Sequence, residues 1–244
     1  MTIDQRVWKR YSARLQKINA EAARLIEAWV GAHGLDDLDA LVDYAYGVAT
    51  KYGEGAGALA AEMYDAISEL SDAGTEPAQA AETATYDDIR KTIFGVVKQS
   101  ANVTLISSAV GRLVKRAGAD TMMQNASRDR AEYAWIAQGD NCPFCMAIAA
   151  EGWKRASRSG IDSHAEHIHG NCDCEFCVRF SPDTNIRGYD PDRYKAIFED
   201  AEGDTEEEKI NALRRENYAE NKDEINEQKR ENYAARQEQE ETDG

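Results

Sequence analysis

All five cysteines of the chain and three of its four histidines lie between Cys142 and Cys177. Clustered cysteines in a chain without a secretory signal favour a metal site, because a disulfide framework spreads its cysteines and usually uses an even number. The window holds a Cys-x-x-Cys pair and, further on, a His-x-x-Cys-x-Cys group. Two such pairs can close a tetrahedral zinc site. The segment is therefore predicted to fold around a structural zinc ion, which holds a small lobe without a large core.

The spacing within the window nominates the ligands. The predicted zinc ligands are Cys142, Cys145, His169 and one of Cys172 or Cys174. The Cys-x-Cys pair leaves that last choice open. The window's other donors are expected to be bystanders: His164, His167 and Cys177. The aromatic residues expected to pack around the site are Trp135, Phe144 and Trp153.

A catalytic zinc is the alternative. The stretch HAEH at 164–167, together with Cys-x-x-Cys, shares residue types with the zinc deaminases, whose signature is His-x-Glu followed by Pro-Cys-x-x-Cys. The order is reversed here, no proline precedes Cys142, and the HExxH and HxxEH patterns of metalloproteases are absent. A metal with four protein ligands leaves no position for water. We therefore expect no enzymatic activity, with a deaminase-like or hydrolytic zinc enzyme as the alternative.

Charge and hydropathy restrict the partners. The net charge is −16, and residues 199–244 hold 17 acidic against 7 basic residues. Such a chain is repelled by a nucleic acid backbone, so no specific nucleic acid binding is expected. The window also lacks the ligand spacing of a DNA-reading two-Cys two-His finger. No run approaches the length of a membrane span, and a soluble protein made in a cytoplasm is expected.

Apolar residues recur every three or four positions through the first 130 residues, which predicts an all-helical body. Gly53 is expected to end one helix, and Lys115, Arg116 and Gly118 to close another. The predicted helices are 4–30, 38–52, 59–70, a short one at 78–84, 89–97 and 103–118.

The pattern changes after residue 130. Residues 133–136 are β-prone and predict a strand that leads into the cysteine window, while 178–190 is expected to be a loop. Asp190 and Pro191 predict the start of a helix. The sequence Arg-Glu-Asn-Tyr-Ala occurs at 215–219 and again at 230–234, in a charged tail that is helical or partly disordered.

The fold class is therefore mainly α. The predicted parts are a helical body at 1–130, a zinc-stapled α+β lobe at 131–189 and an acidic tail at 190–244.

The stretch ASRDRAEYAWIAQGDNCPFCMAIAAEGW, followed after a spacer by HGNCDC, resembles the MuF-like minor head proteins of tailed phages, in the branch from phages of Gram-positive hosts. In that family a strand enters a Cys-x-x-Cys, a helix of small apolar residues follows and ends in glycine, and His-x-x-Cys-x-Cys closes the module. The stretch Asn125–Asp129 also fits the family. The matching positions are Cys142, Phe144, Cys145, Gly152, His169, Cys172 and Cys174.

The resemblance implies a minor structural protein of the phage head that assists head assembly or DNA ejection. It implies a place in the virion near the portal, with the portal protein and other capsid proteins as partners. The helical body also offers surfaces for a homo-oligomer. Cys177 and the His164–His169 cluster depart from the family pattern and leave the ligand choice open.

Overall fold

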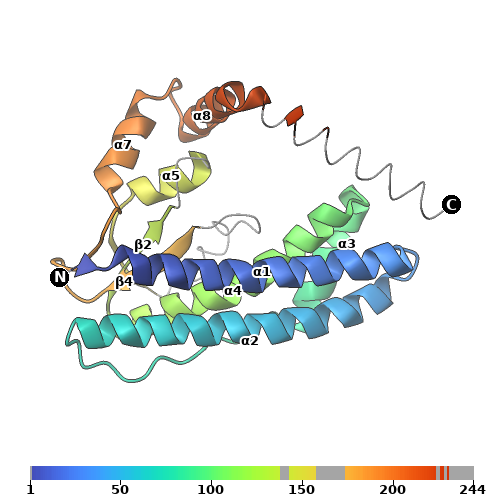
Figure 1. The fold of residues 1–244 in the computed structure, drawn as a ribbon, viewed down its shortest axis with the longest axis horizontal. Coiled ribbons are helices and arrows are strands. Elements are labelled where there is room, and N and C mark those ends of the chain that lie inside the picture. The colour runs from blue at the N-terminus through green and yellow to red at the C-terminus, as the bar shows by residue number, and fades with distance from the viewer. Residues whose placement is uncertain (1, 138–142, 158–173, 224–225, 228–229, 231–244) are drawn as a thin grey trace.

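The computed structural model describes residues 2–137, 143–157, 174–223, 226–227 and 230. Within these residues the protein is mainly helical, as predicted, with seven helices and five short strands (Figure 1). Four long helices form a bundle in which α4 contacts the other three. They are α1 (Gln5–His33), α2 (Leu38–Leu70), α3 (Tyr86–Gln99) and α4 (Val103–Arg128).

Short polar side chains begin each bundle helix. Asp4 accepts a hydrogen bond from the backbone of Arg6 at the start of α1, and Asn102 does the same for Leu105 at the start of α4. Thr85 and Asp88 form a reciprocal capping box at the start of α3. Each such bond satisfies a backbone N–H that has no partner within its helix.

Two predicted helix ends were wrong, because the glycines serve packing. α2 continues through Gly53 to Leu70, and α4 continues ten residues beyond Gly118 to Arg128. A Cβ atom on Gly53 would lie 2.9 Å from Thr83 Cγ2, and one on Gly118 would lie 3.4 Å from the carbonyl oxygen of Ala56. The glycines therefore allow close approach of α2, α4 and the chain that follows α2.

The prediction of a short helix at 78–84 was also wrong. Residues 73–85, here called the strap, contain no helix and connect α2 to α3. Their backbone groups bond to side chains of α2 and α4 instead of to one another. In α1 the first residue of the apolar pattern, Val7, is 44 % exposed, while the adjacent Trp8 is 2 % exposed and starts the buried face.

A three-stranded antiparallel sheet lies beside the bundle, with strand order β3-β2-β4. The central strand β2 (Glu132–Ile136) confirms the predicted strand and pairs with β3 (Lys154–Arg155) and β4 (Glu175–Arg179). Trp135 lies opposite Phe176, with ring centroids 4.6 Å apart. The sheet contacts α2 and α4, and one buried cluster includes residues of both the bundle and the sheet.

A second pairing joins the beginning of the chain to the lobe. β1 (Thr2–Ile3) pairs in parallel with β5 (Asn185–Ile186), so the predicted loop at 178–190 contains strand residues. The predicted boundary between the helical body and the lobe at residue 130 stays a prediction. The bundle and the lobe share one buried cluster.

Three helices form a layer on the other side of the sheet (Figure 1). α5 (Pro143–Ala150) contacts β2, α7 (Pro191–Asp200) and α8 (Glu206–Glu220). Asp190 caps α7 and Pro191 begins it, which confirms that prediction. None of the helices described is long and apolar enough to cross a membrane. Apart from Arg230, the second tail repeat lies outside the described residues.

Candidate metal centre and the adjoining strap

The structure describes two of the five predicted ligand positions, Cys145 and Cys174, which are 1 % and 3 % exposed. The other three, Cys142, His169 and Cys172, lie outside the described residues, as do His164 and His167. Phe144 is half-buried on α5 and Trp153 is half-buried against the core, while Trp135 is fully buried.

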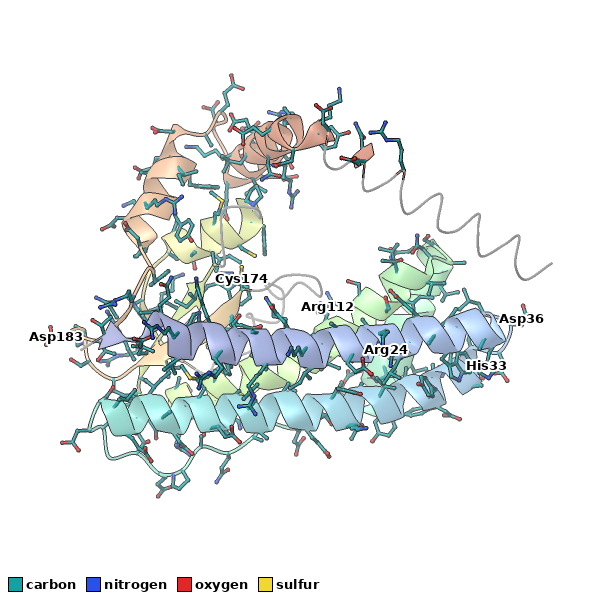
Figure 2. All side chains as sticks on the ribbon, viewed as in Figure 1. Arg24, His33, Asp36, Arg112, Cys174 and Asp183 are labelled. Carbon is teal, nitrogen blue, oxygen red and sulfur yellow. The ribbon has the colours of Figure 1, made fainter. Side chains whose placement is uncertain are left out.

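Both described cysteines lie on segments that adjoin β2: Cys174 is next to its C-terminal end, and Cys145 is on α5. Ile136, the last residue of β2, lies opposite Glu175, so the adjacent Cys174 is next to that end. α5 begins seven residues after Ile136, contacts β2 and carries Cys145 in its first turn. Figure 2 shows Cys174 at the start of β4, on the side of the bundle where α5 lies.

Cysteine binds soft cations such as zinc as the thiolate. Cys145 lies in the first turn of α5, and Cys174 directly precedes β4. In the described part of the chain, no group of three or more His, Cys, Asp and Glu residues is arranged to hold a metal. Cys145 and Cys174 are the two predicted ligands that the structure describes, so the zinc site stays a prediction and the choice between Cys172 and Cys174 stays open.

Cys177 lies in the interior of β4. Its side chain is fully buried, and its thiol donates a hydrogen bond of 3.5 Å to the carbonyl oxygen of Val178. Burial raises the pKa of this thiol. A thiol that stays protonated is neither a good nucleophile nor a good ligand. Its environment is that of a structural cysteine.

A buried ion pair lies directly beside Cys174. Lys115 Nζ of α4 is 3.4 Å from Glu175 Oε1 of β4, and both residues are 2 % exposed. Burial raises the pKa of Tyr11 far above its usual value, and the negative charge of Glu175 adds to this. Lys115 was predicted to lie where a helix closes, which is wrong, because α4 continues to Arg128 and the side chain of Lys115 is buried. The only sequence feature that indicates burial of Lys115 is its position after Leu113 and Val114 in an apolar stripe.

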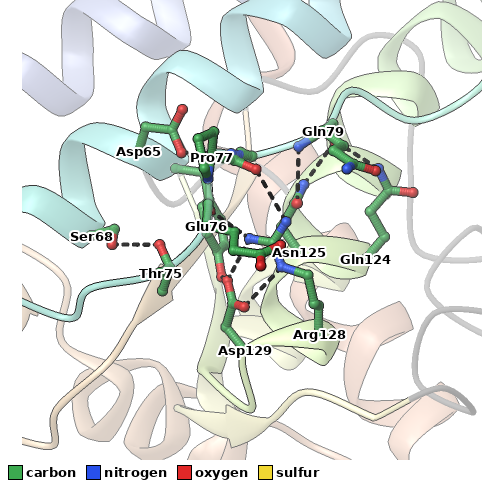
Figure 3. Close-up of polar contacts among 12 residues, drawn as sticks. Asp65, Ser68, Thr75, Glu76, Pro77, Gln79, Gln124, Asn125, Arg128 and Asp129 are labelled. Carbon is green, nitrogen blue, oxygen red and sulfur yellow. Dashed lines mark hydrogen bonds and ion pairs between the residues drawn. The ribbon is translucent and has the colours of Figure 1, made fainter.

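The C-terminal end of α4 binds the strap through side chains (Figure 3). Asn125 accepts a hydrogen bond from the backbone N–H of Gln79 at 3.0 Å and donates one to the carbonyl oxygen of Gln79 at 2.8 Å. Arg128 donates to the carbonyl oxygens of Glu76 at 2.8 Å and Pro77 at 3.1 Å. Asn125 and Arg128 therefore bind the strap through its backbone groups.

Asp129 fixes the guanidinium that makes these contacts. Its carboxylate accepts bonds of 2.8 and 2.7 Å from Arg128 and one of 2.7 Å from the Tyr64 hydroxyl of α2. Burial raises the pKa of Asp129, but the hydrogen bonds from Arg128 and Tyr64 outweigh burial and hold it below the usual value. We call Asn125, Arg128 and Asp129 the clamp.

Further bonds hold the strap along its length. Asp65 of α2 accepts from the backbone of Ala78 at 2.7 Å, and Thr121 of α4 accepts from the backbone of Ala81 at 2.9 Å. The hydroxyls of Ser68 and Thr75 share a bond of 2.6 Å. The clamp lies in the Asn125–Asp129 stretch noted for its family resemblance, so the contacts give that stretch a structural role.

The geometry thus defines a helical bundle, tied by a strap, with a small cysteine-bearing lobe. The chain belongs to the VG15 protein family, whose model matches residues 2–201. This is a viral gene family, and the membership supports a phage origin. The match covers the bundle, the strap, both sheets and α7, and ends before α8. Comparison with curated proteins and with solved structures gives no match.

Proposed function

We propose that the protein is a minor structural protein of a phage head, of the MuF-like kind, and that it associates with the portal. The observation that carries the proposal is the VG15 family match, because it spans bundle and lobe together at residues 2–201. The resemblance of the strand, the Cys-x-x-Cys and the following helix points to the same class. β2 and α5 follow one another in the order that this resemblance implies, and Gly152 follows α5 with φ of +70°.

The architecture suits an assembly component. The strap connects α2 to α4 largely through hydrogen bonds from its backbone groups to side chains of both helices. A strongly acidic surface avoids adhesion to DNA in the capsid. The long bundle helices supply faces for the portal and other capsid proteins.

Zinc belongs to the same proposal. Cys142, Cys145 and His169 would hold it, with either Cys172 or Cys174 as the fourth donor. A bound zinc ion would tie the segments of the lobe together, which is a folding role. We expect Cys145→Ser to release zinc and to unfold the lobe while the bundle keeps its helical circular dichroism. Zinc at full stoichiometry in the purified variant would reject this ligand.

The proposal includes no catalysis. A closed, thiolate-rich site has no water to titrate, so the absorption spectrum of a cobalt-substituted sample should not change near neutral pH. A pH-dependent cobalt spectrum would instead favour the zinc-enzyme alternative built on the 164–167 stretch.

The head function is tested by deleting the gene from its phage and supplying it in trans. We expect the deletion to give particles that are defective in assembly or in DNA ejection, with normal tails, and complementation to restore infectivity. Co-expression with the portal protein should yield a complex on size exclusion. Normal particles and full infectivity without the gene would reject the proposal.

A further inference from the structure

A cleft of about 250 Å³ lies where the start of α1, the end of β2 and the segment from β5 to α7 meet. These segments gather at the end of the molecule that carries the N-terminus (Figure 1). Trp8, Ile136 and Tyr194 contribute apolar surface to the cleft, and Lys9, Arg187 and Arg193 contribute basic groups. The pairing of β1 with β5 holds the two walls together.

The charge of the cleft is opposite to that of the protein. No acidic residue is among the described residues that line it, although the chain carries a net charge of −16. Asp4 and Asp190, which are adjacent in sequence to this region, each cap a helix: Asp4 accepts from the Arg6 backbone and Asp190 from the Arg193 backbone. Across the residues that the structure places, the side chains of Lys9 and Arg187 make no hydrogen bond or ion pair. Two cationic side chains that line one cleft without an ion-pair partner among these residues attract an anion.

Trp8 lines the cleft and is 2 % exposed, and its indole Nε1–H has no hydrogen-bond acceptor among the residues described. A ligand bound beside the indole ring changes the surroundings of this N–H, so the Trp8 resonance reports on the cleft.

We propose that this cleft binds a single oxyanion group, a phosphate or a carboxylate. The guanidinium group of Arg187 matches the paired oxygens of both anions, and Lys9 adds a point charge. The volume holds one such group and its nearest atoms, which excludes a nucleic acid helix. Neither Cys145 nor Cys174 lines the cleft, and the proposal does not depend on the proposed head function.

The indole resonance of Trp8 gives a direct test. The full-length protein, labelled with ¹⁵N, is titrated with inorganic phosphate while chloride keeps the ionic strength constant, and Trp8→Phe assigns the resonance. We expect a saturable shift of the Trp8 indole signal, while the signal of Trp29, at the other end of α1, stays in place. Lys9→Gln and Arg187→Gln should each weaken phosphate binding about tenfold.

Arg10→Gln is the matched control, because Arg10 is an exposed neighbour of Lys9 that lines a different groove. It should bind phosphate as the unaltered protein does. Succinate, titrated in the same way, distinguishes a carboxylate from a phosphate ligand. A matching shift of the Trp8 signal would show that the cleft accepts carboxylates, whereas no shift would assign it to phosphate. A Trp8 signal that follows chloride and phosphate equally, or equal loss of affinity in Arg10→Gln, would overturn the proposal.

Discussion

At the scale of single residues, the clamp shows how buried backbone groups direct side-chain placement. The strap lies against α2 and α4 without helical or sheet bonding, so its N–H and C=O groups need other partners. Asn125 forms hydrogen bonds with both the N–H and the C=O of Gln79, and Arg128 donates to the carbonyl oxygens of Glu76 and Pro77. The sequence marks Asn125 and Arg128 as a motif. It does not show their role, because Gln79 lies 46 residues from Asn125.

Asn125→Ala should lower the free energy of unfolding by about 1–3 kcal/mol, because it leaves the backbone N–H of Gln79 without its partner and removes one of the two bonds to the Gln79 carbonyl oxygen. Urea unfolding followed by circular dichroism measures this. Gln124→Ala is the control, since half-buried Gln124 makes only the second bond to that carbonyl oxygen, which keeps its bond from Asn125, and its loss should cost less than about 1 kcal/mol. Equal losses in the two variants would contradict the role given to Asn125.

Asp129 makes stability depend on pH. Its pKa in the folded protein is lowered, so its contribution is complete above the unfolded value of about 4 and is lost as the pH falls through the folded value. The stability difference between the unaltered protein and Asp129→Asn should therefore be largest at neutral pH and shrink below about pH 4. Urea unfolding from pH 7 to pH 3 tests this, and a constant difference would refute it.

At the scale of elements, the contact of α2 with α4 depends on small residues. Pattern reasoning identified the helical faces but treated Gly53 and Gly118 as stops, because glycine more often ends a helix than continues it. Whether a glycine ends a helix or allows close packing depends on the atoms that lie opposite its Cα in the folded protein. For Gly57 a Cβ atom would lie 3.3 Å from both Ala80 Cβ and Thr121 Oγ1, whereas for Gly47 nothing lies within 4 Å.

These two glycines of α2 should respond oppositely to larger side chains. Gly47→Ala should raise the free energy of unfolding by about 0.5–1 kcal/mol, because alanine loses less backbone entropy in a helix. Gly57→Leu should lower it by about 1–3 kcal/mol or more through overpacking. Thermal and urea unfolding compare the two variants. A tolerated leucine at position 57 would show that α2 and α4 are less closely packed than described.

The buried pair of Lys115 and Glu175 joins α4 to β4. Lys115→Met should cost about 3–5 kcal/mol, because it leaves an uncompensated carboxylate in the interior. The double variant Lys115→Met with Glu175→Leu should be less destabilised than the single one, because two apolar side chains avoid the cost of burying charge. Urea unfolding of both variants decides this. A double variant that is less stable than the single one would mean that the pair is a net source of stability.

At the scale of the whole molecule, the helical class and the strand entering the cysteine window were predictable, because both rest on local periodicity. The strap, β4 and the pairing of β1 with β5 were not, because each depends on partners far away in the chain. For the same reason the cleft between α1 and α7 had no sequence signal. The ligand window remains a prediction, since three of its five positions lie outside the described residues.

The central claim is that this VG15 family protein is a minor component of a phage head. Quantitative mass spectrometry of purified virions, normalised to the major capsid protein, tests it most directly. The account predicts a few copies per particle, retained after the tails are removed from the heads. Absence from heads at a sensitivity below one copy per particle would contradict it.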